Sequence, residues 1–305
     1  MQGIELSYEY YKTYGEPMLQ SEFPALYPRV AAGVCGPGSE NFGFDDDISR
    51  DHDFDPGFFL WLTPEDYKTY EFRLSRAYDR LPEAFMGVPT VGKSVYETAR
   101  HGVREIGAFF TGLTGFAAAP QTNLQWLSVP DHLLAAAVNG KVFYDGAGRV
   151  TEIRNALSAM PEDVRRKKLA KYAVFAAQAG QYNYARALAH GERGAAVLAL
   201  AEFSQNVCRA VYKLNFAYPP FYKWLLRGAK ALPVCGQAAA MCEGLLTDPL
   251  RADVPAEIEA VAALLIAELK RQDLSDLPYD YLEPHANEVL SRIADPALRY
   301  SHVME

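Results

Sequence analysis

Cysteine, long apolar runs and excess positive charge are all scarce in this chain of 305 residues. Its four cysteines are scattered and lack the CxxC spacing and neighbouring histidines of a zinc site, so we expect free, mostly buried thiols in a reducing compartment. No apolar run reaches the roughly 18 residues that a membrane span needs. The first 17 residues lack the cationic and then apolar order of a signal peptide. We therefore expect a cytoplasmic protein.

The charge balance is acidic, with 38 Asp and Glu residues against 30 Lys and Arg residues and a formal net charge of −8. Such a chain exerts no general electrostatic attraction on polyanions, so we expect no nucleic-acid partner. Half of the residues are hydrophobic and 22% are charged, which is ordinary globular composition. The length allows two domains, since single domains mostly have about 100–200 residues.

The first half of the chain alternates between helical and strand patterns. Helices are predicted over residues 4–20, ending near Gly15 to Pro17, and over residues 64–80. Short strands are predicted at 30–35, at the apolar run FFLWL (58–62), at 101–106 and at 141–144. FFLWL is apolar throughout, so this strand is expected to be buried on both faces.

From Glu152 onward the apolar spacing is helical almost throughout, with proline, glycine, Asn or Asp breaks between segments. Predicted helices cover 152–158, 161–178, 193–216, 220–231, 234–246, 254–271 and 284–294. We therefore expect an α+β protein with an N-terminal α/β domain (1–150) and an all-α helical domain (151–305).

Acidic residues concentrate in one stretch between the first two predicted strands. Seven lie within sixteen residues: Glu40, Asp45, Asp46, Asp47, Asp51, Asp53 and Asp55. Carboxylates crowded beside a buried strand repel one another unless a metal ion neutralises them. The stretch therefore predicts a metal-dependent site that handles phosphate.

The two ends of this stretch have different chemistry. Gly36 and Gly38 permit close backbone approach to a ligand, and a short helix beginning at Ser39 would direct its free amides at an anion. Asp51 and Asp53 point the same way on a strand, because side chains alternate between its faces. Such a pair can hold one or two Mg²⁺ ions that bridge the protein and a nucleoside triphosphate.

These residues resemble a known signature. Gly38-Ser39, eleven intervening residues and then Asp51-His52-Asp53 resembles the motif of the nucleotidyltransferase superfamily, which includes polymerase-β-like and aminoglycoside nucleotidyltransferases. The stretch GPGSENFGFDDDISRDHDF resembles more specifically an uncharacterised bacterial domain-of-unknown-function family within that superfamily. Segments 141–145, 184–186 and 218–224 also resemble this family, so the resemblance spans about residues 20–235.

The resemblance implies a nucleotidyltransferase-type α/β domain with a small mixed sheet and flanking helices, followed by a helical bundle. It assigns phosphate binding to Gly38 and Ser39 and metal binding and catalysis to Asp51 and Asp53. The superfamily's third carboxylate lies on a later strand between hydrophobic residues, and Glu105 in Val-Arg-Glu-Ile fits best. Asp145 is its rival.

Two basic residues are further candidates for phosphate binding. Arg50 either offsets the acidic stretch or contacts a phosphate. Lys223 either reaches the triphosphate or lies with its stem on Trp224. A calcium loop beginning at Asp51 is disfavoured, because proline stands where its glycine is needed and Leu62 where its glutamate is needed.

The sequence thus predicts a Mg²⁺-dependent enzyme that transfers a nucleoside monophosphate from ATP or another triphosphate to a hydroxyl acceptor and releases pyrophosphate. Antibiotic, metabolite and protein hydroxyls remain open as acceptors. The alternative is a non-catalytic nucleotide-sensing or partner-binding protein that keeps the same fold.

Overall fold

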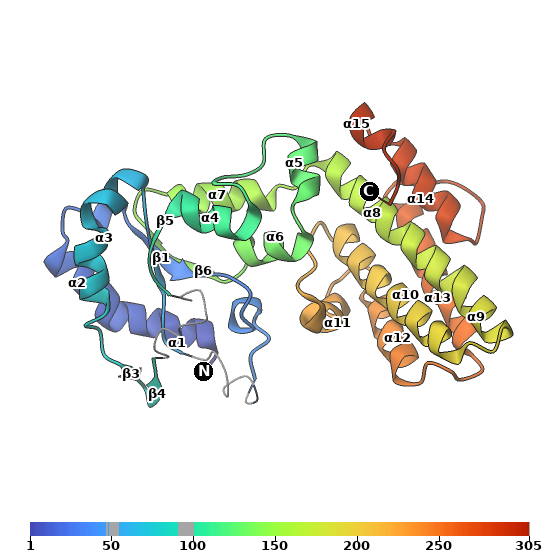
Figure 1. Cartoon of the computed structure of the whole chain (residues 1–305), viewed down its shortest axis with the longest axis horizontal. Coiled ribbons are helices and arrows are strands. Elements are labelled where there is room, and N and C mark those ends of the chain that lie inside the picture. Colours follow the sequence, from blue (N-terminus) through green and yellow to red (C-terminus); the bar gives the residue numbers. More distant parts are fainter. Residues whose placement is uncertain (47, 49–54, 91–100, 305) are drawn as a thin grey trace. The chain divides into compact units, whose positions relative to one another are not determined.

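The computed structural model describes residues 1–46, 48, 55–90 and 101–304 (Figure 1). The chain forms two compact units. The N-terminal unit contains residues 1–120 and 133–159, and the helical unit contains residues 121–132 and 160–305. The domain boundary expected at residue 150 stays a prediction.

The N-terminal unit begins with a helical segment built from α1 (Gly3–Tyr10), the π-helical turn η1 (Tyr11–Gly15) and α2 (Glu16–Glu22). The predicted end near Gly15 to Pro17 is wrong. Pro17 lies in the first turn of α2, directly after the π-helical turn η1, and the chain stays helical through it. Gly15 packs on the ring of Phe58, since a Cβ there would lie 2.5 Å from its Cζ.

A four-stranded mixed sheet forms the centre of this unit, in the order β5-β2-β1-β6. Strands β1 (Ala31–Val34) and β2 (Phe59–Leu62) are antiparallel, as are β1 and β6 (Lys141–Asp145). Strand β5 (Gly102–Glu105) runs parallel to β2. All four residues of β2 are buried, as the FFLWL pattern predicts, and the expected small mixed sheet is confirmed.

Alternation along the strands separates two apolar layers. Leu60 and Leu62 of β2 join the core formed with α1, η1 and α2. Phe59 and Trp61 point to the other face, where their rings contact Phe109 at centroid distances of 4.9 and 5.3 Å. Phe109 belongs to α4 (Ile106–Thr114), so this helix covers the β5–β2 edge on that face.

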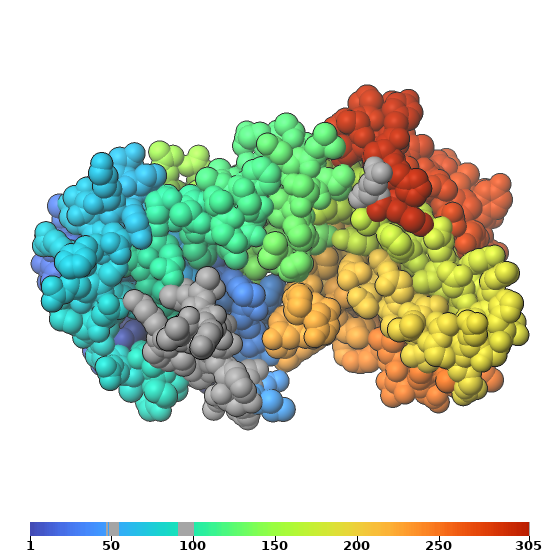
Figure 2. Space-filling view, viewed as in Figure 1, coloured from blue at the N-terminus to red at the C-terminus, as the bar shows by residue number. Residues whose placement is uncertain are grey.

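The remaining elements of the N-terminal unit surround this sheet. Helix α3 (Pro64–Tyr78) begins at the cap Thr63, whose hydroxyl accepts from the Asp66 amide at 3.2 Å, and it forms part of the outer surface (cyan in Figure 2). A two-residue hairpin pairs β3 (Ala84–Phe85) with β4 (Val88–Pro89). Helix α7 (Arg149–Ser158) follows β6.

The helical unit is a bundle with an alanine-rich core. Its elements are α5 (Asn123–Ser128), α8 (Glu162–Ala176), η5 (Ala177–Tyr184), α9 (Ala185–Ala189), α10 (Arg193–Leu214), α11 (Tyr222–Lys230), α12 (Gly236–Thr247), α13 (Val254–Arg271), α14 (Leu282–Ser291) and α15 (Pro296–Arg299). Helix α6 (Asp131–Val138) starts in this unit and continues into the other. The predicted long helices and the α+β class are confirmed; α5, α9 and α15 were not predicted.

An ionic cluster lies inside the helical unit. The Asp131 carboxylate accepts from Lys168 Nζ at 2.7 Å and from the Tyr172 hydroxyl at 2.7 Å, and Lys213 Nζ lies 3.1 Å away. Lys213 is fully buried. Within the described residues, no helix is long and apolar enough to cross a membrane.

Candidate functional site

The glycine turn after β1 is held from a distant part of the chain. Asn139 accepts a hydrogen bond from the Gly36 amide at 2.9 Å and donates one to the Gly36 carbonyl at 2.7 Å. Gly36 has a φ of +138°, which favours glycine. Within the described residues, the amides of Gly38 and Ser39 have no hydrogen-bond acceptor, so this turn presents two free donors.

The short helix predicted after this turn is present as the 3₁₀ turn η3 (Glu40–Phe42), which ends at Gly43 in the left-handed conformation. Ser39 precedes it, and its hydroxyl makes no capping hydrogen bond. Asp45, which follows η3, has a structural role, because its carboxylate accepts from the amide of Gly3 at the start of α1, at 2.8 Å. Asp45 therefore helps to cap the N-terminus of α1.

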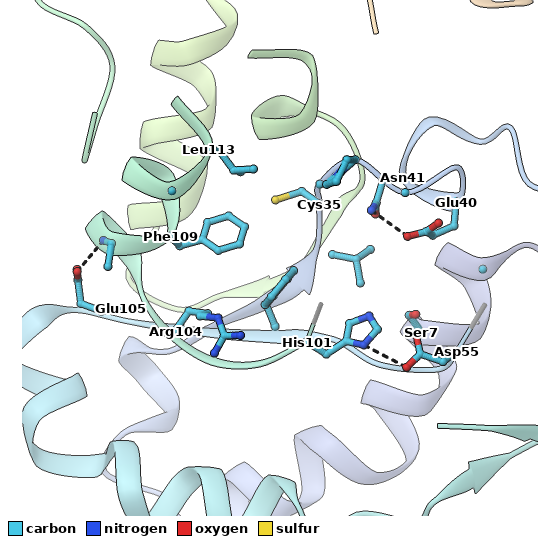
Figure 3. Close-up of a pocket in the computed structure, with 18 of the residues that line it drawn as sticks. Ser7, Cys35, Glu40, Asn41, Asp55, His101, Arg104, Glu105, Phe109 and Leu113 are labelled. Atoms are coloured by element: carbon cyan, nitrogen blue, oxygen red, sulfur yellow. Dashed lines mark hydrogen bonds and ion pairs between the residues drawn. The ribbon is translucent and has the colours of Figure 1, made fainter. Parts of the chain in front are cut away.

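A cavity of about 500 Å³ opens beside the glycine turn (Figure 3). Its walls come from the turn, the start of α1, the residues before β2 and β5, and one side of α4. All of these elements belong to the N-terminal unit. The antiparallel pairing of β1 and β2 brings the glycine turn close to the residues before β2, because it places the end of β1 beside the start of β2.

The side chains of Asp55 and His101 lie against each other at the polar end of the cavity. The distance from Asp55 Oδ2 to His101 Nδ1 is 3.3 Å, and both side chains are largely buried. Gly57 leaves room for the imidazole, since a Cβ there would lie 2.0 Å from Nδ1. The parallel pairing of Phe59 with Gly102 brings His101 and Asp55 together, although they are far apart in sequence.

Asn41 and Glu40 complete the polar end. Asn41 is 9% exposed, and its Nδ2 donates to Glu40 Oε1 at 3.1 Å. Its Oδ1 is buried and has no hydrogen-bond partner within the described part of the chain. The Glu40 carboxylate lies against Gly38, where a Cβ would come within 2.4 Å of it.

Glu105, the predicted third carboxylate, lines the cavity and is also the N-cap of α4. Its two oxygens accept from the amides of Gly107 at 2.6 Å and Ala108 at 2.7 Å. This capping satisfies the free amides of the helix N-terminus, where a negative charge is also favoured by the helix dipole. Its rival Asp145 does not line the cavity; it accepts from the Thr151 amide at 2.8 Å.

The opposite end of the cavity is apolar. Phe109, Gly112 and Leu113 line it from α4, and Phe59 lines it from β2. Cys35 also lies in the wall, where burial raises the pKa of its thiol to about 11 despite the nearby Arg154. Cys35 is therefore a wall residue and not a thiolate nucleophile at neutral pH.

Of the remaining predicted site residues, the structure describes Lys223. Arg50, Asp51 and Asp53 fall outside the described residues. Asp55, two residues after Asp53, lines the cavity. Lys223 belongs to the helical unit, where its Nζ lies 4.8 Å from the centroid of the Trp224 ring, as its structural alternative predicts.

No three His, Cys, Asp or Glu side chains among the described residues are close enough together to hold a metal ion. The described residues alone therefore do not fit a metal site. The predicted Mg²⁺ site depends on Asp51 and Asp53.

Sequence reasoning did not select Asn41, His101 or Arg104, which all line the cavity. His101 stands directly before β5, which is a signal that the residue lies at a strand end. Arg104 alternates with Val103, so an outward position of Arg104 follows from the burial of Val103 in the core. Nothing in the local sequence indicates that the Asn41 carbonyl lacks a partner.

A family model described as "Domain of unknown function (DUF4037)" matches residues 126–225, about a third of the chain. This agrees with the resemblance to a domain-of-unknown-function family, although the match does not include the glycine turn or the Asp51-x-Asp53 motif. No curated protein matches the chain.

Among solved structures, the chain is similar to a nucleotidyltransferase-like protein from Exiguobacterium sibiricum 255-15. The two share 13% sequence identity, with a TM-score of 0.36, over 94% of this chain and 81% of that chain. A similarity this low carries no argument about the site or its activity.

Proposed function

We propose that this protein is a metal-dependent nucleotidyltransferase that uses ATP or another nucleoside triphosphate. One observation carries the proposal: a residue of the glycine turn and a described residue close in sequence to the aspartate pair line the same cavity. Gly38 lines that cavity, and so does Asp55, which follows the Asp51-x-Asp53 pair by two residues. The free amides of Gly38 and Ser39 support a role in phosphate binding.

In the proposed reaction, the acceptor's hydroxyl oxygen forms a bond to the α-phosphorus of the triphosphate. The bond from the α-phosphorus to the bridging oxygen breaks, and pyrophosphate leaves with the electron pair. The hydroxyl proton passes to a carboxylate base, which we assign to Glu105. Mg²⁺ held by Asp51 and Asp53 would neutralise the phosphate charge.

The other predicted residues have supporting roles in this proposal. Gly38 and Ser39 bind the β- and γ-phosphates, and Arg50 adds a guanidinium that suits phosphate. Lys223 remains a proposed phosphate contact. The acceptor is a small molecule or a protein that carries a hydroxyl group.

Nucleotide binding can be tested by thermal unfolding. Mg²⁺ with ATP should raise the melting temperature of the wild type, since a ligand that binds only the folded state stabilises it. The increase should disappear in Asp51→Asn/Asp53→Asn. Asp46→Asn is the control, because it removes one carboxylate from the same acidic stretch and should keep the response. A wild type that no triphosphate stabilises would refute the proposal.

Catalysis needs a separate measurement. Each nucleoside triphosphate, labelled at the α-phosphate, is incubated with the protein, Mg²⁺ and a cell extract as the source of acceptor. We expect label to move to an acceptor with one triphosphate and to stay on the triphosphate in Asp51→Asn/Asp53→Asn. Stabilisation by nucleotide without any label transfer would favour the nucleotide-sensing alternative.

A further inference from the structure

Among the described residues, most of the charged side chains that line the cavity are carboxylates. The described lining has three carboxylates, those of Glu40, Asp55 and Glu105, and one guanidinium, that of Arg104. Arg104 Nη1 donates to the Val103 carbonyl at 3.0 Å. His101 is also present, paired with Asp55. Away from the Gly38 and Ser39 amides, a ligand group that carries positive charge and hydrogen-bond donors suits these carboxylates better than an anion does.

Asn41 points independently to a donor on the ligand. Its side chain is more than nine-tenths buried, it lines the cavity, and its Oδ1 has no partner among the described residues. A buried carbonyl without a donor is unfavourable, and a ligand N–H or O–H would satisfy it. Figure 3 shows Asn41 and Glu40 together on the same side of the cavity.

The other end of the cavity accepts an apolar body. The rings of Phe59 and Phe109 meet edge to face at 4.9 Å. Gly112 lies along the same side of α4, and a Cβ on it would meet no heavy atom within 4 Å. A flat or aliphatic group therefore has both contact surface and room at this end.

We propose that this cavity binds the acceptor, and that the acceptor is a hydroxyl-bearing amine with an apolar body. This inference rests on the proposed function. The protonated amine lies against Glu40, Asn41 and Asp55, and the apolar body lies against Phe59 and Phe109.

The test uses probes that share one ring and differ in charge. Binding of 2-phenylethylamine, 2-phenylethanol and phenylacetate to the full chain is measured by ligand-observed NMR at pH 7. We expect the amine to bind about tenfold more tightly than the alcohol, which is the effect of one charge-assisted hydrogen bond, and phenylacetate to bind least. Putrescine, which has amines but no apolar body, should bind more weakly than 2-phenylethylamine.

Two variants separate the contributions of the two ends. Glu40→Gln should weaken the amine about tenfold and leave the alcohol unchanged. Gly112→Ala should weaken all three phenyl probes by narrowing the cavity, while its folding is kept because alanine favours helix. Gly244→Ala in α12 is the matched control, since its Cβ also meets nothing within 4 Å and it lies in the other unit.

The inference is overturned if phenylacetate binds as well as the amine, if no phenyl probe binds, or if Glu40→Gln changes nothing. Tighter binding of adenosine than of the amine would also overturn it, because the apolar end would then hold the nucleobase. Stabilisation by MgATP without amine binding refutes this inference alone. Amine binding without nucleotide stabilisation refutes the proposed function and leaves an amine site.

Discussion

Buried charge occurs in two contrasting settings, the ionic cluster of the helical unit and the cavity of the N-terminal unit. In the cluster, one carboxylate, Asp131, contacts two ammonium groups and a hydroxyl, all within 3.1 Å. In the cavity, carboxylates outnumber cations and the Asn41 carbonyl has no partner among the described residues. The first arrangement is closed, whereas the second offers hydrogen-bonding capacity to a ligand.

The pKa shifts fit the closed arrangement. Burial alone would raise the pKa of Asp131, but Lys213 and Lys168 hold it below its ordinary value. Burial lowers the pKa of Lys213 to about 8, against the opposite pull of Asp131. Removing one partner would leave the others as unpaired charges inside the bundle, so the three charges depend on one another. The cluster also lies in the segment that matches the family model.

The largest predicted effect on stability comes from removing the carboxylate of the ionic cluster. Asp131→Ala leaves Lys168 and Lys213 buried without their carboxylate, and breaking such a pair costs about 3–5 kcal/mol. We expect this loss in the free energy of unfolding measured with urea. Glu152→Ala is the control, since it breaks an exposed ion pair with Arg149 at 3.2 Å and should cost at most about 1 kcal/mol. Equal losses in the two variants would refute the distinction.

The polar end of the cavity can be disrupted by filling the space that Gly57 leaves for the His101 ring. Gly57→Ala places a methyl group 2.0 Å from the imidazole, which must move away from Asp55. Overpacking of this kind costs about 1–3 kcal/mol. Thermal unfolding and the NMR signals of the His101 ring report the two effects. Gly244→Ala has free space and helix propensity in its favour, so a Gly57→Ala variant as stable as Gly244→Ala would contradict the packing.

Lys213 gives the cluster a pH dependence. Its pKa is about 8 in the folded protein and 10.5 ordinarily, so the unfolded chain binds more protons between these values. Stability therefore rises with pH in this window, by at most about 1.4 kcal/mol per pH unit. Lys213→Met removes this rise and leaves Asp131 bonded to Lys168 and Tyr172. We expect the unfolding free energy of wild type relative to Lys213→Met to increase from pH 8 to 9; a flat or falling difference would contradict it.

The sequence predicted the local elements well and the side-chain neighbours poorly. The burial of Phe59–Leu62 and the strand Gly102–Glu105 follow from residues adjacent in sequence, and the structure contains both. The hydrogen bonds that fix Gly36 come from the Asn139 side chain, 103 residues away, and no local pattern predicts such a contact. The helix that continues past Gly15 depends likewise on its packing against Phe58.

Glu105 shows the same limit, because a strand-end carboxylate between hydrophobic residues is also a good helix cap. Local sequence cannot distinguish the two roles, and in the structure this residue both lines the cavity and caps α4. Its chemical role therefore has to be separated from its structural role by substitution.

Substitution of Glu105 has the smallest predicted effect on stability. It also decides whether this residue takes part in catalysis or only caps α4. Glu105→Ala removes the acceptor of the Gly107 and Ala108 amides and should cost about 1 kcal/mol. Glu105→Ser keeps a capping oxygen and should recover most of that stability, but it supplies no carboxylate. If Glu105 is the catalytic carboxylate, Glu105→Ser folds normally and loses the transfer of the labelled α-phosphate. Transfer at the wild-type rate in Glu105→Ser would assign Glu105 to the structure alone, and the base would then have to be another carboxylate of the cavity.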